Sequence, residues 1–256
     1  MLSSPSGYQD LIDKYGLGLW VRAPDISLDA TGNLAMTTDG NIQFGSVASD
    51  ALHQLVINWR LNAPVMRMLF DANTDLRSRK DEFEDCTTVV IASGQRIASR
   101  AQDLSAYDKA QGEKHSARLG QWTLAGSLMI AAASLLGKFK SEAGASDGEW
   151  SKAQLLCGDV SIGQAIVSAA NFFRHRDEYV KARYAGTVGT RQRNNTAVLL
   201  SALSLADEQD LFGDQSPSER LALLLGGEQF DEFEGAVLRY ANAVAEKAET
   251  RSAGSV

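Results

Sequence analysis

The stretch Ile162–Tyr184, IGQAIVSAANFFRHRDEYVKARY, has the spacing of an amphipathic helix with a polar cluster set into one side. Asn171 and His175 stand four residues apart, Arg174 precedes the histidine, and Glu178 follows it by three positions. Residues three or four apart lie on the same face of a helix. The pattern therefore predicts one helix. Its polar face brings together a carboxamide, a guanidinium, an imidazole and a carboxylate.

The flanks of this helix carry a start signal and a cluster of positive charge. Ser161 or Asp159 is expected to cap its N-terminus, because both side chains can accept a hydrogen bond from a free backbone N–H. The segment that follows, Ala185–Asn195 (AGTVGTRQRNN), indicates a glycine-containing basic loop. Positive residues therefore crowd into one region of the chain, at Arg174, Arg176, Lys181, Arg183, Arg191 and Arg193.

Helix signals also dominate most of the remaining chain. Ser46 can cap a helix, and Pro64 is expected to mark the end of that helix or the start of the next. Ser216–Glu219 (SPSE) is a capping box with proline at the first helical position, and it opens a helix to Leu225. Glu228–Glu249 is amphipathic, with its apolar residues on one face. These patterns predict a mainly helical protein.

Three segments between these helices leave alternatives open. Asp75–Asp103 is charged at first and then carries Thr87–Ile91, a β-branched run that fits either a strand or a helix entering the core. Tyr107–His115 is polar and indicates a loop or a short helix. Ser141–Glu149 is small, polar and glycine-bearing, so it is the best candidate for a linker.

The run Leu119–Gly137 contains no charged residue, which raises the question of a membrane span. Its front half holds Gly, Gln, Thr and Ser, and its strongly apolar part is confined to Leu128–Leu136. A membrane-spanning helix needs about 20 predominantly apolar residues. We therefore expect a buried core helix, whose small residues allow neighbouring helices to approach closely.

Asp25–Gly45 is the first region with a sheet-like pattern. Its apolar pieces are separated by Thr31–Asn33 and Asp39–Asn41, which supply the glycine and asparagine residues that tight hairpins require. A small antiparallel β-meander is expected, and it must lie on helices or pair with another chain to be stable. The apolar pieces are Ile26–Leu28, Leu34–Met36 and Ile42–Phe44.

The predicted fold is mainly α, a helical bundle-like domain with a small N-terminal antiparallel β-meander. Residues 1–140 would hold the meander and several helices, including the apolar core helix. Residues 150–250 would form a C-terminal helical region that carries Asn171 and His175. The two regions can also form one continuous domain. We recognise no internal repeat.

Composition limits the function classes. The 256-residue chain has a net charge of −7 and a pI near 5.1, which disfavours a broad nucleic-acid surface because phosphate backbones require clustered Lys and Arg. Cys86 and Cys157 stand far apart without metal-site spacing, and His53 and His115 have no second ligand at helical spacing. We therefore expect no metal and no cofactor. The N-terminal residues lack the pattern of a secretory signal, which favours the cytoplasm.

Ala170-Asn171-Phe172-Phe173-Arg174-His175 resembles the RNxxxH motif of HEPN-domain proteins, with Asn and His at the family spacing and Ala170 at the position of the family's Arg. Those proteins are helical, commonly dimeric, and many are ribonucleases of toxin and anti-phage systems. The resemblance implies that His175 is the catalytic acid or base at a 2′-hydroxyl, and Arg174 can supply the positive charge. Asn171, Arg176, Glu178, Arg191 and Arg193 would contribute to RNA binding.

The same residues also fit a solvated helix face. Arg174 and Glu178 can form an i,i+4 pair worth about 0.2–0.5 kcal/mol, while Phe172 and Phe173 bury on the other side. In that interpretation the polar cluster has no chemistry, and the protein has no active site there.

The N-terminal segment DISLDATGNLAMTTDGNIQFGSVASDALHQL, residues 25–55, resembles a second family. It looks like the hairpin-then-helix opening of small baseplate wedge proteins of Mu-like phages, with Asn33 where that pattern has Asp. The resemblance implies a structural assembly protein. Two functions therefore remain in view: a HEPN-like RNA-binding or degenerate ribonuclease module, and a non-enzymatic assembly or interaction subunit. Both imply a homo-oligomer or a larger protein complex, with no membrane.

Overall fold

The computed structural model describes residues 6–18, 26–37, 40–88 and 104–253, and it confirms a mainly helical fold with a small β element. The helices are α1 (Ser6–Tyr15), α3 (Val47–Thr88), α4 (Leu104–Glu142), α5 (Asp147–Lys152), α6 (Ile162–Arg174), α7 (Arg176–Tyr184), α8 (Thr190–Ala202), α9 (Pro217–Gly226) and α10 (Phe230–Ala253), with a 3-10 turn at Glu208–Phe212. The strands β1 (Leu155–Cys157) and β2 (Val160–Ser161) form an antiparallel hairpin that the sequence analysis missed.

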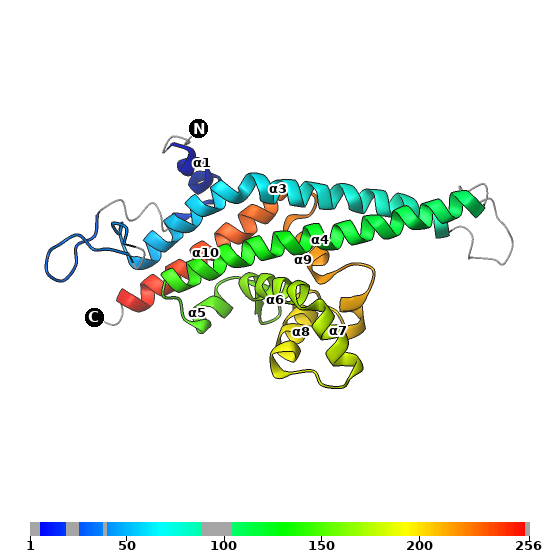
Figure 1. Cartoon of the computed structure of the whole chain (residues 1–256). Coiled ribbons are helices and arrows are strands. Elements are labelled where there is room, and N and C mark those ends of the chain that lie inside the picture. Colours follow the sequence, from blue (N-terminus) through cyan, green and yellow to red (C-terminus); the bar gives the residue numbers. More distant parts are fainter. Residues whose placement is uncertain (1–5, 19–25, 38–39, 89–103, 254–256) are drawn as a thin grey trace.

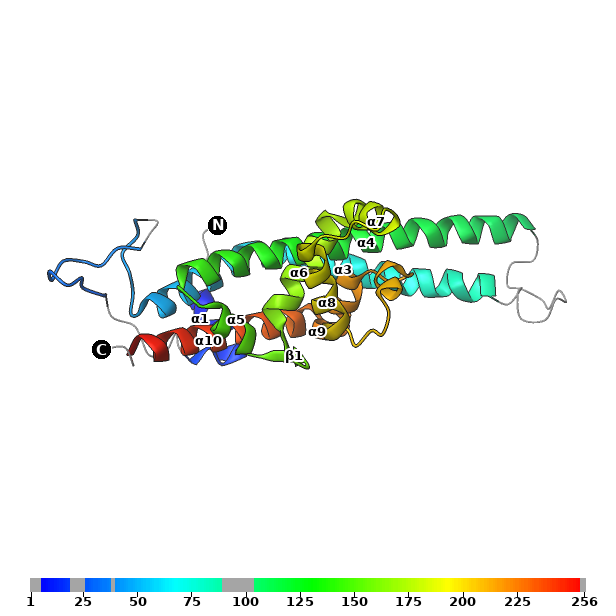
Figure 2. The same cartoon turned by 90° about the horizontal axis from the view of Figure 1, so that it is seen from below.

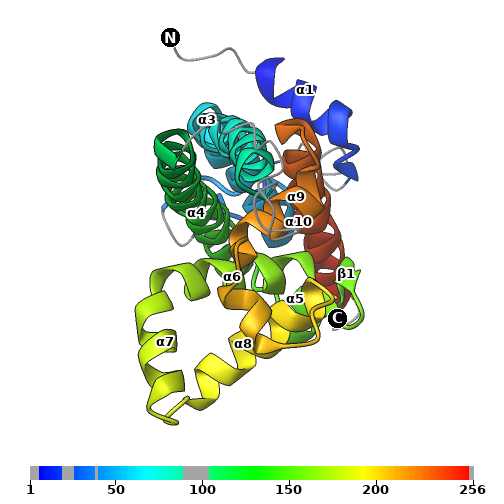
Figure 3. The ribbon, with the colours of Figure 1, turned by 90° about the vertical axis from the view of Figure 1, so that its right-hand side faces the viewer.

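Two long helices form the frame of the molecule. α3 and α4 run antiparallel, side by side, and α10 lies along them toward one end (Figures 1 and 2). α5 to α8 lie on the other side of α4 from α3, whereas α9 packs against both α4 and α10, as the view along the long axis shows (Figure 3). One contiguous buried core draws on residues from Ile12 to Ala248, so all of these layers share it.

α3 is much longer than the sequence predicted, because it continues through Pro64 without ending there. A proline inside a helix removes one backbone hydrogen bond and crowds the preceding turn, which costs about 3 kcal/mol. The packing of α3 along α4 and α10 offsets this cost, and the Pro64 ring lies on the exposed side of the helix. The Thr87–Ile91 run is helical through Thr88, and the rest of it lies outside the described residues.

α4 absorbs two segments that the sequence analysis treated separately. Tyr107–His115, predicted as a loop or short helix, is part of this one helix of 39 residues. The linker candidate Ser141–Glu149 is instead the end of α4, a four-residue connection and the start of α5. The first half of α4 is polar and has a weak helical pattern. Its packing against α3 explains why it is helical nonetheless.

Among the described residues, only α4 has a stretch that is long and apolar enough to cross a membrane. The same helix packs against α3, α6 and α9, and its apolar side chains Leu128, Met129 and Ala132 are fully buried. Core helices of water-soluble proteins meet the same length and hydropathy criteria, so these two properties are weak evidence for a span.

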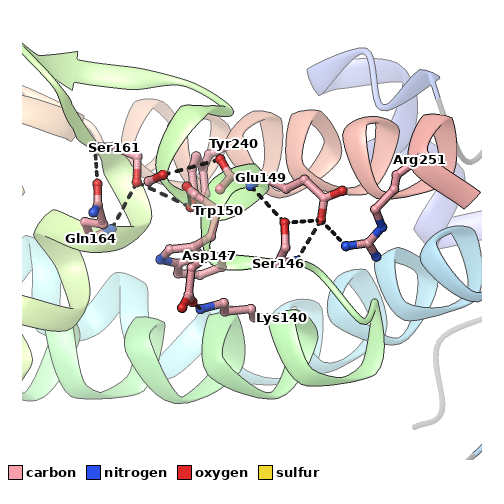
Figure 4. Close-up of polar contacts among 11 residues, drawn as sticks. Lys140, Ser146, Asp147, Glu149, Trp150, Ser161, Gln164, Tyr240 and Arg251 are labelled. Atoms are coloured by element: carbon pink, nitrogen blue, oxygen red, sulfur yellow. Dashed lines mark hydrogen bonds and ion pairs between the residues drawn. The ribbon is translucent and has the colours of Figure 1, made fainter.

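α6 begins where the sequence predicted, and polar contacts fix its start (Figure 4). Ser161 caps it in a reciprocal capping box with Gln164. The Tyr240 hydroxyl donates to the Trp150 carbonyl at 2.6 Å and lies 3.5 Å from the Ser161 hydroxyl, which ties α10 and α5 to this start. A side chain at Gly163 would meet the Tyr240 hydroxyl at 2.4 Å, so only glycine permits the close approach.

The N-terminal β element forms where expected, but it is a closed triangle and not an open meander. Three bridges pair Ile26 with Phe44, Leu28 with Leu34, and Met36 with Ile42, so each segment contacts the other two. Backbone hydrogen bonds of 2.8–3.0 Å close the ring, in which residue 27 donates to 43, 43 to 35 and 35 to 27. We call residues 26–28, 34–36 and 42–44 the β triangle.

The β triangle shows an eight-residue repeat that the sequence analysis did not recognise. Positions 26, 34 and 42 are equivalent, as are 28, 36 and 44, and both intervening turns end in Gly-Asn. Gly32 and Gly40 have positive φ, as the turn prediction required. Asp29 organises the first turn by accepting hydrogen bonds from the Thr31 hydroxyl and from the backbone of Thr31 and Asn33, which lower the pKa of its carboxyl.

The β triangle has its apolar side chains on the outside. The central residues Ser27, Ala35 and Gln43 are half-buried, whereas all six large apolar residues are 37–64% exposed. The triangle extends beyond the end of the helices, beside the start of α3, to which the Asp50 carboxylate connects it by accepting from the Phe44 N–H at 3.1 Å (Figures 1 and 2). The exposed residues are Ile26, Leu28, Leu34, Met36, Ile42 and Phe44.

The docking of α1 gives a testable prediction. Asp231 at the start of α10 pairs with Lys14 of α1 at 2.8 Å and with Arg67 of α3, and these hydrogen bonds hold the pKa of its carboxyl below its usual value. A carboxyl whose pKa is lower in the folded than in the unfolded protein stabilises the fold at pH values above its unfolded-state pKa. This contribution is lost as the pH falls below about 4. Asp231→Asn should therefore cost up to about 1 kcal/mol at neutral pH and less near pH 2–3.

Hydrogen exchange should locate this loss. The α1 amides should exchange faster in Asp231→Asn at pH 7, because two links from α10, to α1 and to α3, are weakened. Asp75→Asn is the control, since its partner Arg79 lies on the same helix and α1 is not involved. Equal α1 exchange in the two variants would contradict this account.

Candidate functional site

The helix that was predicted to span Ile162–Tyr184 is broken at His175, so this prediction was wrong. His175 has φ −116° and ψ 18°, outside the helical range, and it separates α6 from α7. The two helices meet at a steep angle in the end-on view (Figure 3). Asn171 and His175 therefore do not share the face of one continuous helix with Glu178.

Aromatic packing accounts for the break. Phe172 and Tyr179 are seven residues apart, which in a straight helix separates them by about 10 Å along the axis. Their ring centroids are only 5.1 Å apart, and Phe212 packs on Phe172 at 5.2 Å. Asn195 of α8 also donates to the Tyr179 hydroxyl at 2.9 Å. The turn at His175 brings α7 back so that Tyr179 is buried in this cluster.

A cleft of about 390 Å³ opens beside the break. Its walls come from α4, from the α6–α7 junction and from the start of α9, which are far apart in the sequence. Its floor is apolar and its rim carries Arg174, His175, Arg176, Asp177 and Glu178. The apolar residues are Leu119, Trp122, Phe172, Phe173, Leu211 and Pro217.

Two guanidinium groups lie over the indole ring of Trp122. The Arg176 group is 4.1 Å from the ring centroid and the Arg118 group 4.8 Å, which are distances of cation–π contacts. Arg118 is also fixed by Asp214 at 2.8 Å and by the Gly213 carbonyl at 2.9 Å. Burial, together with the nearby positive charge of Arg118, lowers the pKa of Arg176. The Trp122 ring of α4 thus lies against Arg118 of the same helix and Arg176 of α7.

The start of α9 is as sharply defined as the sequence predicted. Ser216 and Glu219 form the capping box, with Pro217 in the first turn. The Glu219 carboxylate accepts from the Ser216 N–H at 2.6 Å, while burial raises the pKa of this carboxyl. Ser216 and Pro217 line the cleft, so this cap positions one of its walls.

His175 is half exposed on the rim, and its Nδ1 lies 3.2 Å from the Glu178 carboxylate. It lines both the cleft and a smaller hollow that Arg191 also lines. Ala170, at the position that the HEPN motif gives to Arg, is buried in the core. Formal charge on the cleft rim is balanced, because Arg174 and Arg176 face Asp177 and Glu178 across a short span of chain.

The structure brings some of the predicted site residues together and separates others. Arg174, His175, Arg176 and Glu178 all line the cleft, and Arg191 lines the neighbouring hollow. Asn171 lies one turn back on α6, half-buried, and contributes its carbonyl to the His175 N–H at 3.1 Å. The predicted basic loop ends at Gly189, where α8 begins, so Arg191 lies in the first turn of a helix.

Arg193 does not face the cleft. Its side chain donates twice to the Val188 carbonyl, at 3.0 and 3.1 Å, and so closes its own loop. Sequence reasoning missed Leu119 and Trp122, because their uncharged context indicated a core helix and gave no sign of a cleft. It also missed the β triangle as a surface, although the eight-residue spacing of its apolar residues was a readable signal.

Comparison of the chain with family models, with curated proteins and with solved structures returned no match. Within the described residues, no group of three or more His, Cys, Asp or Glu side chains is arranged to hold a metal ion.

A glycine in α4 shapes the cleft and gives the second prediction. A Cβ at Gly126 would stand 2.2 Å from the ring of Phe173, which lines the cleft. Gly126→Ala should lower the free energy of unfolding by about 1–3 kcal/mol, because the ring must move. Gly112→Ala, in the same helix with nothing within 4 Å, should be neutral or stabilising by up to about 1 kcal/mol.

Urea unfolding of both variants tests the close contact. Equal stability of Gly126→Ala and Gly112→Ala would show that α6 does not approach α4 so closely, and the described cleft would lose one wall.

Proposed function

We propose that this protein is a non-enzymatic assembly subunit, a cytoplasmic component of a larger protein complex, which docks through its β triangle. One observation carries the proposal: six large apolar side chains on the triangle are exposed, while its central residues are small or polar. Such an arrangement does not stabilise an isolated domain, because a small β element is stable only when its apolar face packs against another surface. Contiguous exposed apolar patches mark interaction sites.

The energetics favour a covered triangle. Removing such side chains from water contributes on the order of 1 kcal/mol each when about half of the side chain is still exposed. Six of them together can offset a substantial part of the entropy cost of association. The absence of Lys and Arg between residues 23 and 59 disfavours an anionic membrane surface as the partner, because acidic headgroups would repel the four Asp residues of this segment.

The third prediction separates docking from folding. The triple variant Leu28→Ser, Leu34→Ser, Met36→Ser, which we call the triangle variant, removes three exposed apolar side chains. Unfolding free energy should change by no more than about 0.5 kcal/mol per site, because these side chains are in water already. A photo-cross-linking residue at position 28 should give one adduct of discrete mass in the cell, and the same residue at position 79 should give none.

Two results would remove the proposal. One is a large loss of stability in the triangle variant, which would show that these side chains are packed within the monomer. The other is the absence of any adduct at position 28 in the intact protein.

A second function is supported by a specific observation, the meeting of Arg174, His175 and Arg176 at one cleft. Arg174 makes no hydrogen bond or ion pair within the described part of the chain, so its charge is available to a phosphate. We keep as the second proposal a HEPN-like RNA-binding or degenerate ribonuclease module of a defence or toxin system. The burial of Ala170 at the motif's Arg position weighs toward binding over cleavage.

The fourth prediction applies to this second function. The protein should retain mixed RNA on a filter, and any cleavage should persist in chelator and disappear in His175→Ala, because the imidazole is the only motif residue that can move a proton. Arg79→Ala, at the far end of α3, is the control. If the wild-type protein neither retains nor cleaves RNA, the second function is excluded and the first is unaffected.

A further inference from the structure

The first turn of α9 brings an unpartnered polar side chain to the cleft at the α6–α7 break. Ser218 lines this cleft and is only 2% exposed, and its hydroxyl makes no hydrogen bond within the described part of the chain. The other two hydroxyls of the lining are engaged. Ser216 accepts from the Glu219 N–H at 3.2 Å, and Thr123 donates to a carbonyl of its own helix at 3.0 Å. Because buried polar groups are normally hydrogen-bonded, the Ser218 hydroxyl points to a ligand in the cleft.

The backbone of the same turn favours a carboxylate as the group that Ser218 binds. Pro217 has no N–H, and the N–H groups of Glu219 and Arg220 donate to Ser216 at 3.2 and 3.1 Å. The Ser218 N–H is left without an acceptor among the described residues. A helix N-terminus attracts anions, because its free N–H groups point outward and its dipole is positive there. Ser218 therefore offers two donors, its N–H and its hydroxyl, to one carboxylate.

The acidic residue of this turn is already accommodated by the protein. The Glu219 carboxylate accepts from the Ser216 N–H at 2.6 Å, and the positive charges of Lys80 on α3 and Arg118 on α4 favour its ionised form. Its charge is therefore offset from the side of the long helices.

The rim of the cleft leaves one charge of each sign without a salt bridge. Arg176 is engaged over an indole ring at 4.1 Å, and the Glu178 carboxylate lies 3.2 Å from His175. Arg174 and Asp177 are both exposed, and neither forms a salt bridge with a described residue. A rim that is balanced in this way does not select a net anion or a net cation. It is complementary to a small ligand that carries both charges.

The size and the floor of the cleft limit the rest of the ligand. Its volume of about 390 Å³ is at the low end of the range of about 300–1,000 Å³ found for small-molecule sites. Leu119, which is 51% exposed, and the half-buried Phe173 offer apolar surface to an occupant. The cleft therefore has room for one large apolar group with a polar head.

We propose that the cleft binds a free α-amino acid with a large apolar side chain. Its carboxylate accepts from the N–H and the hydroxyl of Ser218 and faces Arg174, its ammonium group faces Asp177, and its side chain lies on Leu119 and Phe173. The proposal goes beyond the assembly function and does not depend on it, because the β triangle lies at the far end of the molecule, beyond the start of α3 (Figure 1).

Titration of the protein with L-phenylalanine, followed by NMR chemical shifts of the backbone amides, gives the fifth prediction. The wild-type protein should bind with a Kd on the order of 0.1–1 mM, because so small a ligand makes few contacts. The amide of Ser218 should be among those that shift. Two probes of similar shape, 3-phenylpropionate without the ammonium group and 2-phenylethylamine without the carboxylate, should each bind at least about tenfold more weakly.

Variants assign the two charges of the ligand to their partners. Ser218→Ala should weaken L-phenylalanine about tenfold and leave 2-phenylethylamine unchanged, because only the carboxylate uses the hydroxyl. Arg174→Gln should weaken L-phenylalanine and 3-phenylpropionate alike. Asp177→Asn should remove the preference for L-phenylalanine over 3-phenylpropionate. The matched controls Asp75→Asn and Arg79→Gln change an exposed ion pair on α3 and should bind all three probes as the wild type does.

Three outcomes would overturn the proposal: a folded wild-type protein that does not bind L-phenylalanine at about 10 mM, equal affinity of the wild type for L-phenylalanine and 3-phenylpropionate, or unchanged binding in Ser218→Ala. None of them affects the assembly function, whose test is the adduct at position 28. Failure of the amino-acid site and failure of the assembly function are therefore distinguishable.

Discussion

Burial of α10 is the constraint on which the rest of the structure depends. Its apolar face is almost completely removed from water, and it contacts α1, α3, α5, α6 and α9. Two polar anchors set its position along the bundle. The buried Glu234 carboxylate accepts from Tyr15 of α1 at 2.7 Å and from Trp59 of α3 at 2.9 Å, and the Tyr240 hydroxyl bonds to the end of α5. A buried carboxylate with two donors tolerates little displacement.

The parts farthest from this core carry the features that suggest function. The β triangle has no apolar interior, and α7 is attached through the aromatic cluster around Phe172 and Tyr179. The β triangle exposes apolar side chains, and the cleft beside α7 carries both positive and negative side chains at its rim. The long helix α3 also exposes large apolar side chains, at Leu61, Val65 and Met68.

Much of the fold could be predicted from local signals. The capping boxes at Ser161 and Ser216 were readable because each involves a few consecutive residues. The turn glycines Gly32 and Gly40 were readable for the same reason. The candidate site was only partly predictable. His175 and its arginine neighbours stand together in the sequence, but Leu119 and Trp122 join them from α4, and no spacing rule connects positions more than fifty residues apart.

The sequence alone determined the helical class, the helix starts at Ser46, Ser161 and Ser216, and the turns of the β element, since these follow from hydrogen bonds and periodicity over a few neighbouring residues. Tertiary structure decided that α3 continues through Pro64, that the motif helix breaks at His175, and that three apolar segments close into a triangle. In each case contacts between distant segments outweigh a local preference of a few kcal/mol, and a local pattern does not contain that competition.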